Sequence, residues 1–128
     1  MEKSGLILEG GGLRGVFSSG VLDYMMENDI VFPYVIGVSM GALNGASYVS
    51  KQIGRSLRVP MTFMGDSRYL SLKNFIIEGS YFGMNFIFDK IVNELDTFDF
   101  DSFEKSNKRF IAVAANCNKG TPEYFDKD

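Results

Sequence analysis

The chain has 128 residues, enough for a single domain whose core needs no disulfide or metal. Its composition, with 45% hydrophobic and 23% charged residues, is typical of a globular protein and excludes a disordered or fibrous one. The net charge of -3 argues against a basic surface, so we expect no nucleic-acid partner.

The numbers of histidine and cysteine residues narrow the possible functions further. The chain has no histidine, which excludes a Ser-His-Asp triad within it and removes the commonest zinc ligand. Cys117 is the single cysteine, so no intramolecular disulfide can form, and we expect its side chain to be buried. Because no apolar leader follows Met1, we expect a cytoplasmic protein.

The first fifty residues predict two strand-helix pairs. Gly5–Leu8 and Tyr34–Val38 are short apolar runs typical of buried parallel strands. Residues 16–28 and 40–51 follow them as predicted helices. Although residues 30–50 carry no charge, the glycines and Pro33 within them argue against a membrane span. In the first helix the spacing predicts a buried apolar face opposite a polar one; the apolar residues are Phe17, Val21 and Met25, and the polar ones are Ser19, Asp23 and Glu27.

The second half of the chain is harder to interpret between Gly54 and Asp101. Residues 86–95 have helical spacing, and the many aromatic residues around them favour helices packed over the sheet, with a lipid-facing lid as the alternative. Acidic residues from Asp96 to Glu104 lack the calcium-loop spacing, so we expect a solvated loop and no metal. Arg109–Asn116 is a third predicted strand, and Lys119–Pro122 a turn.

The segment Gly37-Val38-Ser39-Met40-Gly41 has the Gly-x-Ser-x-Gly pattern of a nucleophile elbow. Ser39 directly follows a predicted strand and opens a predicted helix, which is the setting this motif requires. Gly37 and Gly41 allow the strand and helix to approach closely, and the helix start favours negative charge near Ser39. We therefore interpret Ser39 as a candidate nucleophile.

The segment Gly10-Gly11-Gly12-Leu13-Arg14-Gly15 is a second glycine motif between strand and helix. It also fits the dinucleotide pattern Gly-x-Gly-x-x-Gly, but the second strand ends in Ser39 and not in the acidic residue that holds a ribose. Val16 replaces the lysine of a phosphate-binding P-loop. Both glycine motifs leave the carboxyl ends of parallel strands, so their backbone amides and Ser39 are expected to converge on one carbonyl group.

The paired motifs resemble the start of the patatin-like phospholipase family, particularly its bacterial members. The similarity runs from Gly5 to about Ser50, with weaker likeness in residues 109–125. The resemblance implies a three-layer α/β/α sandwich with a mostly parallel sheet. It further implies a serine-aspartate dyad with Ser39 as nucleophile, no cofactor, and an oxyanion hole at Gly11 and Gly12 with Leu13 and Arg14, between the loop glycines Gly10 and Gly15.

The family's aspartate lies in an Asp-Gly motif, and these 128 residues contain no Asp-Gly pair. We therefore expect residues 1–128 to be the N-terminal portion of a patatin-like catalytic domain, truncated before the dyad aspartate and poorly active alone. The expected function is acyl-ester hydrolysis in a lipid; the alternatives are a noncatalytic lipid-binding module and, more distantly, a dinucleotide-binding protein. Peripheral membrane contact and a homo-oligomer through an exposed sheet edge remain open.

Overall fold

The computed structural model describes residues 4–127, which fall into two compact units. The first unit contains the chain up to Leu57 together with the chain from Asp99 onward, and the second is Arg58–Phe98. The two glycine motifs and all four strands belong to the first unit.

The first unit is built on a four-stranded sheet in the order β1-β2-β3-β4. β1 (Gly5–Leu8), β2 (Tyr34–Val38) and β3 (Arg109–Asn116) are parallel neighbours, and β4 (Thr121–Asp126) pairs antiparallel with β3. Leu8 lies opposite Gly37, and Gly37 lies opposite Ala112. The carboxyl ends of the three parallel strands therefore share one edge of the sheet, as the sequence predicts.

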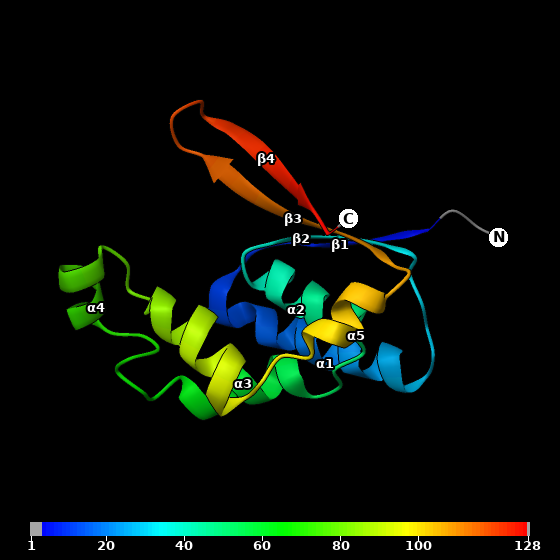
Figure 1. Ribbon diagram of the computed structural model, residues 1–128, viewed down its shortest axis with the longest axis horizontal. Helices are drawn as coiled ribbons and strands as arrows, with labels where there is room; N and C mark the ends of the chain where they lie inside the picture. The colour runs from blue at the N-terminus through cyan, green and yellow to red at the C-terminus, as the bar shows by residue number, and fades with distance from the viewer. Residues whose placement is uncertain (1–3, 128) are drawn as a thin grey trace. The chain divides into compact units, whose positions relative to one another are not determined.

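Helices α1 (Gly15–Glu27), α2 (Met40–Val49) and α5 (Phe100–Lys105) lie on one face of this sheet (Figure 1). α2 packs directly on β1, β2 and β3, with α1 and α5 beside it. The buried core between helices and sheet contains Leu8, Leu22, Met26, Val35, Tyr48, Val49 and Phe110. The predicted α/β fold with a mostly parallel sheet is confirmed.

Within the first unit, no helix covers the opposite face of the sheet among the described residues. Ile7 on β1 is 81% exposed, and Val38 on β2 is exposed as well. Parallel strands usually carry apolar side chains on both faces because both faces are normally covered. Within the first unit, helices α1, α2 and α5 form the layer on one of these faces.

The predicted apolar face of α1 is wrong at Phe17 and Val21, whereas Met25 packs against the core as predicted. Phe17 is 81% exposed and Val21 is exposed, whereas Ser19, Leu22 and Met26 are buried. A buried serine is tolerated because its hydroxyl is hydrogen-bonded within the helix layer. The helix is thus rotated so that a small polar side chain lies against α2.

Three expectations for the end of the chain also need correction. Residues 100–105 form the short helix α5 where a solvated loop was expected, because the Asp99 side chain caps it by accepting a hydrogen bond from the Ser102 amide at 2.9 Å. The predicted turn ends at Gly120, and β4 begins at Thr121. Cys117 is exposed in that turn and not buried.

The second unit contains α4 (Leu72–Glu78) and the π-helix η2 (Phe86–Leu95), and the boundary with the first unit falls within α3 (Arg55–Phe63). Its small core consists of Tyr69, Phe86, Ile87 and Ile91. The Phe63 and Phe86 rings meet edge to face with their centroids 5.8 Å apart. No helix within residues 4–127 is both long and apolar enough to cross a membrane.

Candidate active site

Ser39 occupies the sharp turn between β2 and α2. Its backbone angles are φ 54° and ψ -124°, a region that residues other than glycine rarely adopt. Such strain persists only where the surrounding structure enforces it, and it is found at functional sites. The turn leaves Ser39 exposed at the amino-terminal end of α2, where the helix dipole favours negative charge.

The two elbow glycines permit this turn because they carry no side chain where two backbone segments meet. A Cβ atom on Gly37 would lie 2.7 Å from the Ala42 nitrogen, on the first turn of α2. A Cβ atom on Gly41 would lie 2.6 Å from the Glu9 carbonyl oxygen, just beyond β1. Neither position has room for a methyl group, so the sequence interpretation of these glycines as sites of close approach is confirmed.

The glycine-rich loop lies directly against the elbow. A Cβ atom on Gly10 would lie 3.2 Å from the Ser39 Cβ atom, so the two motifs are neighbours in space. The loop continues into the short 3-10 helix η1 (Gly12–Arg14), which runs into α1 at Gly15. Gly12 has a φ of 55°, a left-handed conformation that glycine adopts without strain.

Arg14 and Leu13 lie on the solvent side of this loop, where both are exposed. The Arg14 amide donates a hydrogen bond to the Gly11 carbonyl at 3.2 Å, and its guanidinium Nε lies 3.5 Å from the same oxygen. These bonds hold the loop closed around Gly11. The other backbone amides of the glycine-rich loop lie in a turn and at the start of η1, beside Ser39.

A buried polar cluster connects the two motifs, and sequence reasoning missed it. The Asn44 side-chain amide on α2 donates to the Gly15 carbonyl at 2.9 Å, and the Ser19 hydroxyl donates to the Asn44 side-chain oxygen at 3.2 Å. Asn44 and Ser19 are almost completely buried. Since Gly15 ends the glycine-rich loop and α2 begins at the elbow, the cluster fixes one motif relative to the other. The signal available in the sequence was an asparagine within an uncharged helix.

No carboxylate among residues 4–127 is hydrogen-bonded to Ser39. Several aspartates of the first unit are held elsewhere: Asp23 accepts from the Gly54 amide at 2.9 Å, and Asp29 pairs with Lys51. Asp99 caps α5, and its pKa is lowered by hydrogen bonds from Ser102. The described residues therefore supply an elbow and a loop of amides, without a carboxylate hydrogen-bonded to Ser39.

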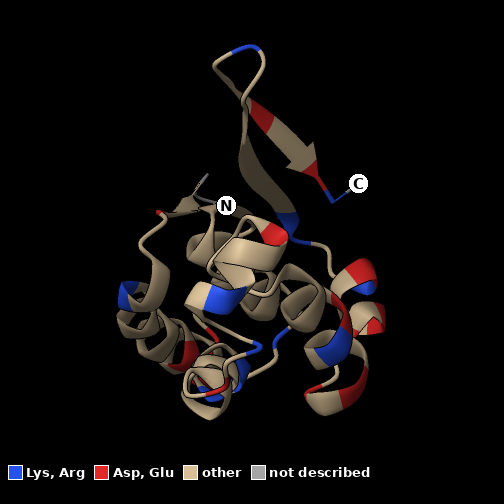
Figure 2. Ribbon diagram, turned by 90° about the vertical axis from the view of Figure 1, so that its left-hand side faces the viewer, with Lys and Arg blue, Asp and Glu red and all other residues tan. Residues whose placement is uncertain are grey.

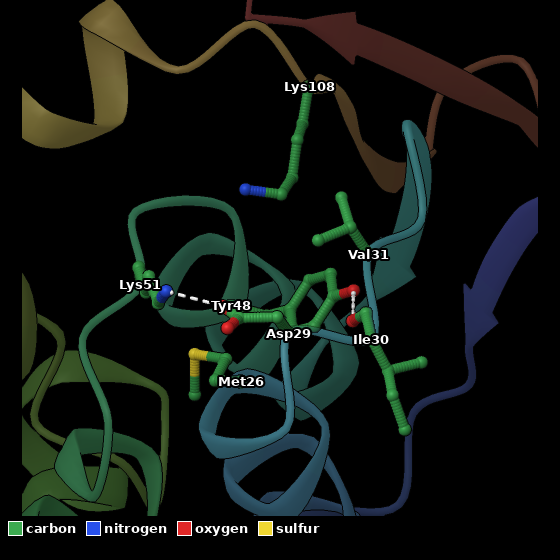
Figure 3. Close-up of a pocket in the computed structure, with 7 residues that line it drawn as sticks. All are labelled: Met26, Asp29, Ile30, Val31, Tyr48, Lys51 and Lys108. Atoms are coloured by element: carbon green, nitrogen blue, oxygen red, sulfur yellow. Dashed lines mark hydrogen bonds and ion pairs between the residues drawn. The ribbon is translucent and has the colours of Figure 1, made fainter.

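A small pocket of about 110 Å³ lies at the other end of α2 (Figure 3). The Lys108 ammonium extends over the Tyr48 ring and lies 3.4 Å from the Val49 carbonyl oxygen, where it complements the negative end of the helix. Burial lowers the pKa of Lys108, and the nearby charge of Lys51 lowers it further. The residues lining the pocket are Met26, Asp29, Ile30, Val31, Tyr48, Lys51 and Lys108. The pocket lies beyond the carboxyl end of α2, whereas Ser39 lies at its amino end.

Comparison with known proteins identifies the lineage of this arrangement. The sequence matches the family described as patatin-like phospholipase over residues 6–127, which includes both glycine motifs and all of the sheet except Gly5. The chain belongs to the patatin-like phospholipase family. The family membership agrees with the resemblance seen in the two glycine motifs.

Two curated relatives share this patatin-like region. The chain is 27% identical over 124 residues to "Uncharacterized protein YjjU" of Escherichia coli (strain K12), covering 94% of this chain and 34% of that protein. It is 31% identical over 127 residues to "Lysophospholipase nte1" of Aspergillus terreus (strain NIH 2624 / FGSC A1156), covering 94% of this chain and 8% of that protein. The chain thus spans about a third or less of the length of these relatives. No solved structure matches it.

Proposed function

We propose that the protein is a serine-dependent lipid acyl hydrolase in which Ser39 is the nucleophile. The observation that carries the proposal is the strained Ser39 turn, with Gly10 of the glycine-rich loop in contact range. Membership of the patatin-like phospholipase family and similarity to a protein named a lysophospholipase support a lipid ester as substrate.

In the proposed reaction the Ser39 hydroxyl oxygen attacks the ester carbonyl carbon, and the leaving alcohol takes up a proton as the acyl-enzyme forms. A water molecule then attacks the acyl-enzyme, which releases the fatty acid and regenerates the serine. The backbone amides of Gly11 and Gly12, with the loop through Leu13 and Arg14, are proposed to hold the oxyanion in both steps. A positioned aspartate, as the family resemblance implies, would accept the serine proton.

A noncatalytic lipid-binding module is the second candidate. The observation that favours it is that no carboxylate of residues 4–127 is hydrogen-bonded to Ser39. A serine hydroxyl is a weak nucleophile without a base, so we expect the 128-residue chain alone to hydrolyse esters poorly even when it folds. We further propose that the protein is cytoplasmic, that it contacts a membrane surface, and that it associates with a second copy through the β1 or β4 edge of the sheet. In Figure 2, basic and acidic segments are interspersed along the helices, which gives no support to a nucleic-acid partner.

The two functions are separated by labelling the protein with a fluorophosphonate probe and by measuring hydrolysis of a short-chain nitrophenyl ester. A hydrolase reacts at Ser39, and Ser39→Ala abolishes both labelling and turnover, whereas Ser18→Ala on α1 keeps both. Lipid binding without labelling or turnover favours the binding module. Activity above about a hundredth of the wild-type rate in Ser39→Ala would remove Ser39 from the proposed role.

A further inference from the structure

Helix α4 in the second unit exposes apolar side chains and buries a polar one, the reverse of a normal surface helix. Its single buried residue is Asn74, which is 9% exposed, whereas Ile76 and Ile77 are 77% and 69% exposed. Leu72 and Phe75 are exposed as well. A surface helix of a globular protein normally buries its apolar residues. In α4 a buried asparagine faces the protein and the aliphatic side chains face outward.

Hydrogen bonds at the base of the helix hold it in this orientation. The Asn74 side-chain amide lies 3.3 Å from both the Arg68 and the Tyr81 carbonyl oxygens, which it bonds as donor. The Ser71 hydroxyl caps the helix by accepting from the Asn74 amide at 3.1 Å, and the Ser71 amide donates to the Tyr81 carbonyl at 2.9 Å. At the other end Gly79 closes the helix in a left-handed conformation. Rotating α4 to bury the isoleucines would break the Asn74 bonds.

The exposed apolar residues of α4 lie on its outward side, which together with Tyr81 we call the α4 face: Leu72, Phe75, Ile76, Ile77 and Tyr81. The Phe75 and Tyr81 rings stack with their centroids 4.6 Å apart, so the aromatic part of the face is prearranged. Within the second unit, α4 stands apart from α3 (Figure 1). Exposed apolar surface of this kind marks a site of interaction with a partner or a membrane.

Lys73 decides between these partners. At about 100° per residue it projects between Ile76 and Ile77, toward one end of the apolar arc, whereas Glu78 projects near the buried side of Asn74. We infer that the α4 face binds a phospholipid surface, with its apolar side chains among the acyl chains and Lys73 extended toward the lipid phosphates. In a dry protein interface that covers both isoleucines, the Lys73 ammonium between them would lose its water, and charged residues are depleted from the buried parts of protein interfaces.

The inference rests on the proposed function in one respect: a lipid hydrolase must reach a substrate at a surface. Binding to that surface can be measured without turnover. The chain has no tryptophan, so Ile76→Trp in a Ser39→Ala background places a single fluorescent reporter on the α4 face. We expect its emission to shift to shorter wavelength when vesicles of phosphatidylcholine and phosphatidylglycerol are added. Met61→Trp on α3, in the same background, is the matched control and keeps its spectrum.

The loss experiment uses Ile76→Ser/Ile77→Ser in the same background, with Met61→Ser as control. Because two exposed isoleucines leave the lipid contact, vesicle partitioning falls roughly tenfold or more, and the melting temperature is preserved. Lys73→Glu weakens binding to the anionic vesicles more than to pure phosphatidylcholine. Equal partitioning of the double variant and the control, with both folded, overturns the inference. So does a dimer that dissociates in the double variant while vesicles leave the Ile76→Trp spectrum unchanged.

The failure of this inference and the failure of the proposed function give different results. If α4 binds lipid and the protein is not a hydrolase, the vesicle measurements succeed and the fluorophosphonate probe does not react. If the protein is a hydrolase that does not use α4, Ile76→Ser/Ile77→Ser in the protein with Ser39 intact hydrolyses vesicle lipid and soluble nitrophenyl ester at unchanged rates. If both hold, the double variant loses turnover of vesicle lipid and keeps turnover of the soluble ester.

Discussion

Asp29 and Lys51 lie just beyond the ends of α1 and α2, share a left-handed backbone conformation and form an ion pair of 2.8 Å. Their φ angles are 52° and 55°, values usually left to glycine at this position. Each helix ends with the same kind of hydrogen bond: Ile30 donates to the Met25 carbonyl in α1, and Gln52 donates to the Ser47 carbonyl in α2, both at 2.9 Å. The ion pair thus connects two helix ends built in the same way.

Asp29→Asn tests this connection through pH. Asparagine has the same shape and tolerates the left-handed backbone, so the substitution removes only the charge. The Lys51 hydrogen bond and charge lower the pKa of Asp29 in the folded protein. A lowered carboxylate pKa adds stability above the pKa of the unfolded chain, about 3.9, and that stability disappears as pH falls through the folded value. We expect wild type to be more stable than Asp29→Asn at pH 7 and equal to it near pH 2.

Urea unfolding of both proteins across this pH range, at low and high salt, measures the effect. Because both side chains are exposed, salt should reduce the difference at pH 7. A difference that persists at pH 2 would contradict the electrostatic explanation and point to a change in helix termination.

Gly41→Ala should destabilise the fold, because the new methyl group would collide with the Glu9 carbonyl beyond β1. We expect a loss of about 1–3 kcal/mol in the free energy of unfolding, together with loss of ester hydrolysis as the Ser39 turn moves. Gly20→Ala is the matched control, since a Cβ atom there meets nothing within 4 Å and the residue lies inside α1. It should stabilise the protein by about 0.5–1 kcal/mol. Similar unfolding curves for both variants would refute the close approach.

Asn44→Ala should loosen the link between the two glycine motifs. Removing its side chain leaves the Gly15 carbonyl without that donor and Ser19 without that acceptor, at a cost of about 1–3 kcal/mol. A double-mutant cycle with Ser19→Ala should show coupling of about 0.5 kcal/mol or more, because the two side chains share a bond. Additive losses would show that the buried cluster does not act as a unit.

Gly12→Ala tests the proposed oxyanion loop. Its φ of 55° disfavours any side chain, although no atom lies within 4 Å of the new Cβ position. The loop should therefore relax with a small loss of stability, and a displaced amide should lower turnover by roughly a hundredfold, as expected for one lost oxyanion donor. Gly120→Ala, with a φ of 64° and equally open surroundings, controls for backbone strain. Unchanged turnover in Gly12→Ala would place the oxyanion donors elsewhere.

The parallel strands were predictable because each is a compact apolar run with a clear boundary. Glycines follow β1, the elbow follows β2, and the bounds predicted for β1, β2 and β3 are those of the structure. The adjacency of the two glycine motifs also followed from the sequence, since parallel strands bring their carboxyl ends to one edge.

The missed features depend on contacts that no local pattern contains. The face of α1 is set by Ser19, whose hydroxyl meets Asn44 25 residues later in the chain. β4 is an edge strand with Pro122 and few apolar residues, so it lacks the pattern of a buried strand. The orientation of α4 is likewise fixed by Asn74, a residue that sequence patterns assign to the solvent side.

The register of the sheet carries a consequence for the order of folding. Gly5 pairs with Tyr34 after 29 residues, whereas Tyr34 pairs with Arg109 only after a further 75. Closing the longer loop costs more chain entropy, so β1, α1 and β2 can associate before β3 joins them. Because α2 starts at the end of β2, the strained turn at Ser39 belongs to this early region, and β3 with β4 docks onto an elbow that is already bent.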